Sequence, residues 1–185
     1  DGNNRRNYQL AISAIEKIHE IDDSIQFVFL GPVIAKVGQE VFSKISNLID
    51  KGVNIEHKFD TQSNKIFENE MIKCDVVFMP VVVNYKYEGI NEKYGQTKVS
   101  GVLYDMMRFQ KPGIIPAEHI VPPTMQTSII TYNSEADFIE KLIALNKNRT
   151  TLEKYLKCAE DNSIYYSTVK VKERFLPMLF ESISQ

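Results

Sequence analysis

Short apolar runs alternate along this chain with longer segments whose apolar residues recur every three or four positions. The runs, such as 26–30 and 113–115, have the length of buried strands, and the segments between them have helical spacing. This alternation is typical of βα units around a parallel sheet whose two faces are covered by helices. The sequence therefore predicts an α/β fold, a Rossmann-like doubly wound parallel sheet of about five to six strands.

The pattern predicts five strands and seven helices within a single domain spanning 1–185. Strands are expected over residues 26–30, 53–57, 75–82, 113–115 and 128–131. Helices are expected near residues 5–21, 37–51, 66–74, 99–107, 134–146, 152–159 and 169–180. Ser134 with Asp137 resembles a capping box, and Pro177 is expected to kink the last helix. A doubly wound domain usually begins with a strand, whereas this pattern begins with a helix, so we expect a strand upstream of Asp1.

Composition excludes several classes of protein. The 185 residues carry 24 acidic and 22 basic side chains, a net charge of -2 without a basic block, which argues against nucleic acid as a partner. The longest apolar run, 76–83, is far shorter than the ~20 residues of a transmembrane segment. Cys74 and Cys158 lie far apart and are expected to be reduced thiols in a cytoplasmic protein. The first methionine is Met71, so we expect the chain to be a piece of a longer protein.

An unusually long connection, Asn84–Lys98, follows the predicted strand at 75–82. Connections in α/β units usually have ~2–6 residues, and ligands of open parallel sheets bind beyond the carboxyl ends of the strands. The connection leads to Ser100 and Gly101 at a helix start, where exposed amides and Lys98 could bind a phosphate. Alternatively, Ser100 is an ordinary N-cap and Lys98 a solvated surface charge.

Further candidate residues lie elsewhere on the predicted helices and strand ends. Asp105, one turn into the same helix, could accept hydrogen bonds from two sugar hydroxyls or be a solvated acid near the helix N-terminus. Arg5 and Arg6 fall in the first turn of the first predicted helix, where cations oppose the macrodipole. They either bind an anion or lie on a frayed terminus. Gly31 ends a strand, where it allows either a ligand approach or a plain turn.

Other common chemistries lack their motifs. The sequence has no Gly-x-Gly-x-x-Gly, no Gly-Lys-Ser/Thr loop and no Gly-x-Ser-x-Gly elbow. Its histidines, His19, His57 and His119, are scattered without metal-type partners, so no metal site is expected. His57 and His119 lie near predicted strand ends, where they could contact a ligand or be ordinary loop residues.

Several motifs, taken in order, resemble the donor-binding domain of GT-B glycosyltransferases of the group 1 type. In that family an apolar strand ending near proline leads to a Glu-Gly loop. A helix then carries an acid near the start of an acid-x-x-x-x-Gly-Lys-Pro pattern and precedes a short apolar strand. This sequence has Ile72–Pro80, Tyr87–Gly89 and Tyr104–Ile115 in the corresponding order, with Phe27–Gly31 and Asp137–Asn146 as the earlier strand-glycine and the late helix.

The resemblance covers about Asn3 to Phe180 and implies a cytoplasmic glycosyltransferase of polysaccharide biosynthesis. Such an enzyme transfers a sugar from a nucleotide-diphosphate-sugar donor to an acceptor, without a metal or other cofactor. This chain would be its donor-binding half, with an N-terminal acceptor domain as partner, through which the enzyme could associate with a membrane. Helices within 150–185 would cross back toward that partner domain.

The resemblance also implies roles for individual residues. Asp105 would hold the ribose, Ser100 and Gly101 would present amides to the diphosphate, and Lys98 with Arg5 or Arg6 would neutralise the phosphates. The remaining implied donor-binding positions are Gly31, Glu88, Gly89 and Thr97. The sequence departs from the family where Thr97 and Asp105 replace glutamates and where Gln110 replaces a glycine.

Two other functions are compatible with the same pattern. One is a nucleotide-sugar epimerase of similar architecture, which needs ionisable side chains gathered between two domains. The other is a non-catalytic Rossmann-like module whose Asn84–Lys98 connection contacts a protein.

Overall fold

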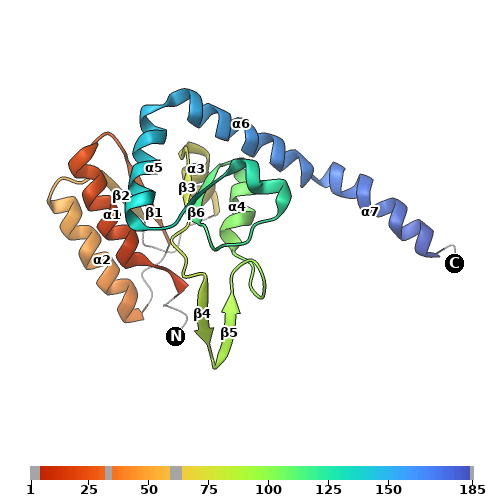
Figure 1. Cartoon of the computed structure of the whole chain (residues 1–185), viewed down its shortest axis with the longest axis horizontal. Helices are drawn as coiled ribbons and strands as arrows, with labels where there is room; N and C mark the ends of the chain where they lie inside the picture. The colour runs from red at the N-terminus through yellow and green to blue at the C-terminus, as the bar shows by residue number, and fades with distance from the viewer. Residues whose placement is uncertain (1–4, 32–34, 59–63, 184–185) are drawn as a thin grey trace.

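Five parallel strands surrounded by helices form the centre of the molecule (Figure 1). The computed structural model describes residues 5–31, 35–58 and 64–183. The parallel strands are β1 (Phe27–Leu30), β2 (Ile55–Lys58), β3 (Val77–Phe78), β6 (Gly113–Pro116) and β7 (Ile129–Tyr132). β1 pairs with β2, and β6 lies between β3 and β7, so the strands form two hydrogen-bonded groups. The Rossmann-like α/β prediction is confirmed, although β3 is shorter than predicted because it ends before Pro80.

The described residues form the helices α1 (Tyr8–Ile21), α2 (Ala35–Asp50), α3 (Asn64–Lys73), α4 (Gly101–Phe109), α5 (Glu135–Lys147), α6 (Arg149–Tyr165) and α7 (Thr168–Ile183). Helices cover both faces of the three-stranded group. Ile114 of β6 packs in one core with Ala14 of α1 and Phe138 of α5, whereas the next residue, Ile115, packs in another with Leu103 of α4. Successive strand side chains point to opposite faces, so the two cores lie on opposite sides of the strands.

The first helix begins later than the sequence predicts. α1 starts at Tyr8, and the Asn7 side chain caps it by accepting from the Leu10 amide at 3.0 Å. Arg5 and Arg6 precede the helix and lie along the residues that follow β3. The prediction that they occupy the first helical turn is wrong, and the argument from the macrodipole does not apply to them.

The connection predicted over residues 84–98 contains a β-hairpin. Its antiparallel strands are β4 (Asn84–Tyr87) and β5 (Ile90–Lys93). Glu88 and Gly89 form the turn with φ of 48° and 86°, which are the left-handed values of a tight hairpin turn. The alternation of tyrosines with polar residues before this Glu-Gly pair was the signal for a hairpin.

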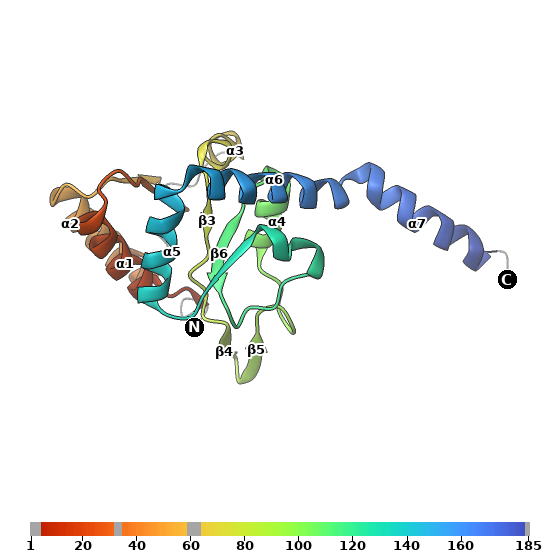
Figure 2. The same cartoon turned by 45° about the horizontal axis from the view of Figure 1, so that its top comes forward.

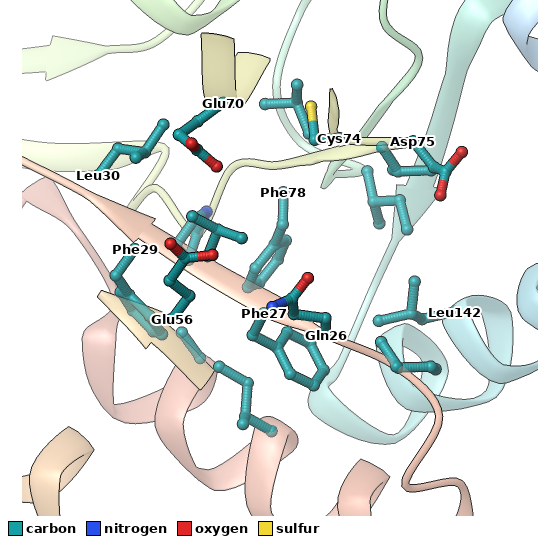
Figure 3. A pocket seen from close by; sticks show the side chains of 18 of the residues that line it. Gln26, Phe27, Phe29, Leu30, Glu56, Glu70, Cys74, Asp75, Phe78 and Leu142 are labelled. Carbon is teal, nitrogen blue, oxygen red and sulfur yellow. The ribbon is translucent and has the colours of Figure 1, made fainter. Parts of the chain in front are cut away.

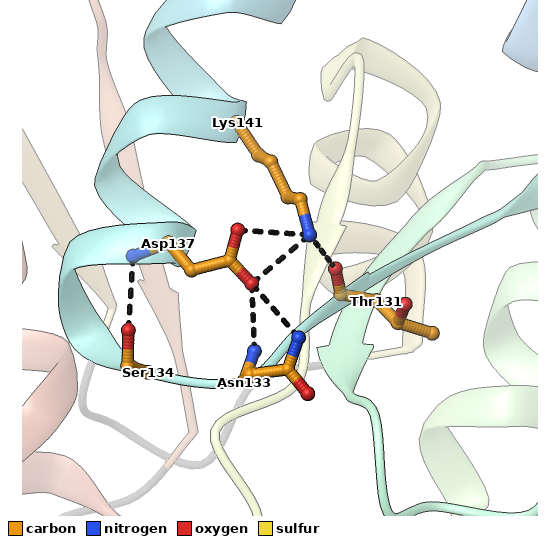
Figure 4. A network of polar contacts seen from close by, with 5 residues as sticks. All are labelled: Thr131, Asn133, Ser134, Asp137 and Lys141. Carbon is orange, nitrogen blue, oxygen red and sulfur yellow. Dashed lines mark hydrogen bonds and ion pairs between the residues drawn. The ribbon is translucent and has the colours of Figure 1, made fainter.

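Ser134 is the predicted N-cap of α5, whereas the Asp137 carboxylate bonds the Asn133 amide in place of the Ser134 amide that a capping box uses (Figure 4). The Asp137 amide donates to Ser134 Oγ at 3.2 Å. The Asp137 carboxylate accepts from the Asn133 amide at 2.8 Å and from Lys141 Nζ at 2.9 Å. Lys141 also donates to the Thr131 carbonyl at 2.7 Å. The network ties the end of β7 to the start of α5.

α7 extends away from the rest of the molecule (Figure 2). α6 packs on the body through the 3₁₀ helix η2 (Pro123–Ser128) and α4. By contrast, Val169, Phe175 and Leu176 of α7 are 64%, 54% and 46% exposed. Pro177 lies inside this helix, as predicted.

Candidate functional site

The carboxyl ends of the parallel strands carry several of the predicted residues. Gly31 directly follows β1, with φ of 138°, and its amide donates to the Lys58 carbonyl at 3.1 Å. Among the described residues other than its chain neighbours, no heavy atom lies within 4 Å of the place where a Cβ would be. Gly31 is therefore a turn residue whose positive φ favours glycine.

Ser100 occupies the N-cap position of α4 without capping it. Its hydroxyl is buried and donates to Met79 Sδ at 3.2 Å, and it makes no side-chain bond to the helix amides. Gly101 begins the helix and is exposed, with nothing within 4 Å of its Cβ position. The first amides of α4 therefore lack a side-chain acceptor, and a helix N-terminus of this kind attracts anions.

Asp105 lies one turn further along α4 and is only partly exposed. Burial raises the pKa of its carboxyl group, and the nearby Arg108 opposes that rise. A partly desolvated carboxylate is a strong hydrogen-bond acceptor, so Asp105 could bind paired hydroxyl groups.

A cavity of about 730 Å³, which we call the slot, separates β1 from β3. Phe27–Leu30 and Val77–Phe78 form its two edges, and Arg6, Pro80 and Asp105 are among the residues that line it. The fold thus brings Arg6 and Asp105, far apart in the sequence, to the lining of one cavity. These are the only two of the predicted site residues that line it within the described chain.

Glu88 and Gly89 lie apart from this group. They form the exposed tip of the hairpin (Figure 1), and β4 alone spans about 13 Å at ~3.3 Å per residue. The structure therefore does not bring them to the N-terminus of α4.

Thr97 and Lys98 belong to the turn that joins β5 to α4. The Thr97 hydroxyl accepts from the Lys93 amide at 2.8 Å and contacts the Glu92 carboxylate. The Lys98 carbonyl accepts from the Gly95 amide at 2.8 Å. Thr97 thus stabilises the turn, and Lys98 stands two residues before Ser100 with a partly exposed side chain.

His119 is a residue of this edge whose burial the sequence did not indicate. It follows β6, is 4% exposed and stacks on Tyr94 with ring centroids 5.9 Å apart. Burial lowers its pKa, and neither ring nitrogen has a hydrogen-bond partner among the described residues. Asn84 Nδ2 donates to Glu118 Oε2 at 2.9 Å beside it. The loop after β6 is therefore packed against the base of the hairpin.

Within residues 5–31, 35–58 and 64–183, no group of three or more His, Cys, Asp or Glu side chains is placed to hold a metal ion. No helix in the same part of the chain is long and apolar enough to cross a membrane.

Comparison with known proteins gives a likeness in fold. No protein-family model matches the chain, and no curated protein matches it. The crystal structure of TarM matches with a TM-score of 0.60 at 17% sequence identity, covering 94% of this chain and 32% of the TarM chain. The chain thus spans about a third of the length of TarM. At this identity the likeness shows the fold alone.

Proposed function

We propose that the chain is the nucleotide-sugar-binding half of a glycosyltransferase. The fold supports this proposal because TarM, which shares it, is a glycosyltransferase of the GT-B type. The resemblance of the sequence motifs to the donor-binding domain of that class supports it independently of TarM.

The observation that carries the proposal is the start of α4, where Ser100 does not cap the helix and Asp105 follows one turn later. Arg6 and Asp105 both line the slot. Amides at a helix N-terminus and a nearby guanidinium favour a diphosphate, while a carboxylate favours the hydroxyls of a ribose. The two kinds of group therefore match the two parts of a nucleoside diphosphate.

In this proposal the chain contributes electrostatic stabilisation rather than a nucleophile. Negative charge develops on the diphosphate as its bond to the sugar breaks. The amides of Gly101 and Val102, together with Lys98 and Arg5 or Arg6, would stabilise that charge without a metal ion. Asp105 would fix the position of the nucleotide.

The acceptor would be held by a second, N-terminal domain. The exposed apolar residues of α7, Val169, Phe175 and Leu176, support a contact with another folded unit. Transfer of the sugar, in polysaccharide biosynthesis or elsewhere, would need both domains.

Calorimetric titration with UDP, GDP and ADP tests the proposal. We expect one of them to bind, and Asp105→Asn and Lys98→Met each to weaken binding by at least about tenfold, since a hydrogen bond to a charged group contributes roughly 1.5–3 kcal/mol. Asp50→Asn and Lys154→Met change exposed residues outside the site and should leave the affinity within about twofold. No binding of any of the three nucleotides, or equal effects of site and control variants, would contradict the proposal.

A further inference from the structure

The slot interrupts what would otherwise be one continuous sheet (Figure 3). α1 and α5 contribute residues to its lining from one face of the sheet, and α3 and α4 contribute residues from the other. Most of the lining is apolar, including Phe27, Phe78 and Leu142. The slot therefore lies between two strands and is lined mainly by apolar side chains.

The edge of β1 that faces the slot is unpaired. The amides of Phe27 and Gly31 donate toward the β2 side, at 2.9 Å and 3.1 Å. Backbone groups alternate in direction along a strand, so the amides of Val28 and Leu30 point into the slot. β1 pairs with β2 and with no other strand of the described chain.

The opposing edge of β3, which also faces the slot, is likewise unpaired within the described chain. The amides of Val77 and Met79 donate toward the β6 side, at 2.9 Å and 3.0 Å. Phe78 therefore presents its amide and carbonyl to the slot. Unpaired backbone groups in an apolar interior are costly, which makes two facing open edges an incomplete arrangement.

The length of the slot matches one strand. All of β1, Phe27–Leu30, lines one edge, and residues 75–78 line the other. A strand between these edges would have about the length of β1, roughly four or five residues. Because helices lie on both faces, every side chain of such a strand would be apolar.

The path of the chain indicates where the strand comes from. The Val82 amide donates to the Arg5 carbonyl at 3.0 Å, and the Asn7 amide donates to the Pro80 carbonyl at 2.6 Å. The chain therefore approaches α1 from the carboxyl end of the slot, which is the end where a strand parallel to β1 and β3 would leave. A strand in the slot, α1 and β1 would then form one βα unit with a short connection.

We propose that the slot is the seat of a sixth parallel strand of four or five apolar residues, supplied by polypeptide joined directly to Asp1. It would hydrogen-bond to β1 on one side and to β3 on the other. The strand order becomes β2, β1, new strand, β3, β6, β7, which is the doubly wound order 3-2-1-4-5-6. The order reverses between the new strand and β3, where Arg6 pairs with Val81, and ligands of such sheets bind at this switch point. The slot itself is then not a ligand pocket.

Hydrogen exchange of the unmodified chain tests whether the facing edges of β1 and β3 are unpaired. The amides of Val28, Leu30 and Phe78, the slot-facing amides, should exchange at least about tenfold faster than those of Phe27 and Val77, because an unpaired amide is protected less than a strand-bonded one. Equal protection of the two sets would show that β1 and β3 pair directly, and the proposal would fail.

A chain with an added N-terminal segment tests whether a strand can occupy the slot. The chain is extended directly before Asp1 by five valine and isoleucine residues, and the matched control carries proline at the third and fourth positions of the extension. We expect the slot-facing amides to gain at least about tenfold protection in the first protein and none in the second, since proline cannot donate to either edge. Sedimentation is measured in parallel. The proposal would be overturned if protection does not increase, or if it increases equally in the proline control. It would also be overturned if protection increases only in a dimer, because a second copy would then occupy the slot.

Discussion

The three-stranded group β3–β6–β7 and the two-stranded group β1–β2 come from the same βα pattern but differ in burial. Gly113, Ile114 and Ile115 of β6 are all buried, and the last two are 0% exposed. No residue of β1 or β2 is fully buried, and Val28 is 36% exposed. β6 has a strand on each side and helices on both faces, whereas β1 borders the slot. The burial of a strand in a parallel sheet thus depends more on having a neighbouring strand on each side than on the apolar content of the strand itself.

The largest expected difference between the two groups concerns their aromatic residues. Phe138 is 0% exposed and stacks on Phe78 with centroids 4.1 Å apart, whereas Phe29 of β1 is only partly buried. Phe138→Ala should lower the free energy of unfolding by about 3–5 kcal/mol, and Phe29→Ala by less than about half of that. Urea denaturation measures both. Equal losses would mean that the two groups are equally well packed.

Two glycines with similar φ allow the effect of packing to be separated from the effect of backbone strain. Gly95 and Gly52 have φ of 86° and 89°, so alanine is strained at either position. A Cβ at Gly95 would lie 2.2 Å from the Ile120 carbonyl oxygen, whereas nothing lies within 4 Å at Gly52. Gly52→Ala should destabilise by about 1–2 kcal/mol from φ alone, and Gly95→Ala by about 1–3 kcal/mol more from overpacking. Urea denaturation of both variants checks this, and equal effects would contradict the packing of the loop after β6 against the hairpin.

A pH titration of stability is expected to show a smaller effect that belongs to the three-stranded group. Burial lowers the pKa of His119 below its ordinary value of 6.5, so the unfolded chain binds this proton more tightly than the folded protein. The stability should be complete above about pH 6.5 and should fall as the pH drops from there toward the folded pKa. His119→Phe should remove this dependence, and His57→Phe, on an exposed position of β2, should retain it. An unchanged pH profile in His119→Phe would refute the prediction.

The smallest expected effect on stability is at the candidate site. Burial raises the pKa of Asp105, so its ionised form is disfavoured by folding, and that penalty is present above the folded pKa. Asp105→Asn should therefore leave the free energy of unfolding at pH 7 unchanged or raise it, by less than about 1 kcal/mol. Thermal melts measure this change. A clear loss of stability would show that Asp105 has a structural role.

Local signals in the sequence were sufficient for much of the fold. The five parallel strands, the helices and the cap of α5 depend on patterns within a few residues, and Ser134 with Asp137 forms the predicted cap. What the sequence could not indicate depends on distant partners. Arg5 and Arg6 lie outside α1 because their backbone pairs with residues 80–82, and Ser100 turns its hydroxyl to Met79.

In the candidate site too, the sequence predicted what nearby residues determine and missed what distant residues determine. The order of the motifs predicted Gly101 and Asp105 on one helix, because their spacing fixes their relation. It could not predict that Arg6 lines the same cavity as Asp105 or that the hairpin holds Glu88 and Gly89 away, because both depend on tertiary packing.

The most direct test of the central claim is to follow backbone amide shifts during titration with UDP, GDP and ADP. We predict that one nucleotide shifts the amides of Arg6, Gly101, Val102 and Asp105, and that Asp105→Asn abolishes these shifts at the same concentrations. Shifts confined to other parts of the chain, or no shifts with any of the three, would contradict a nucleotide site at this end of the sheet.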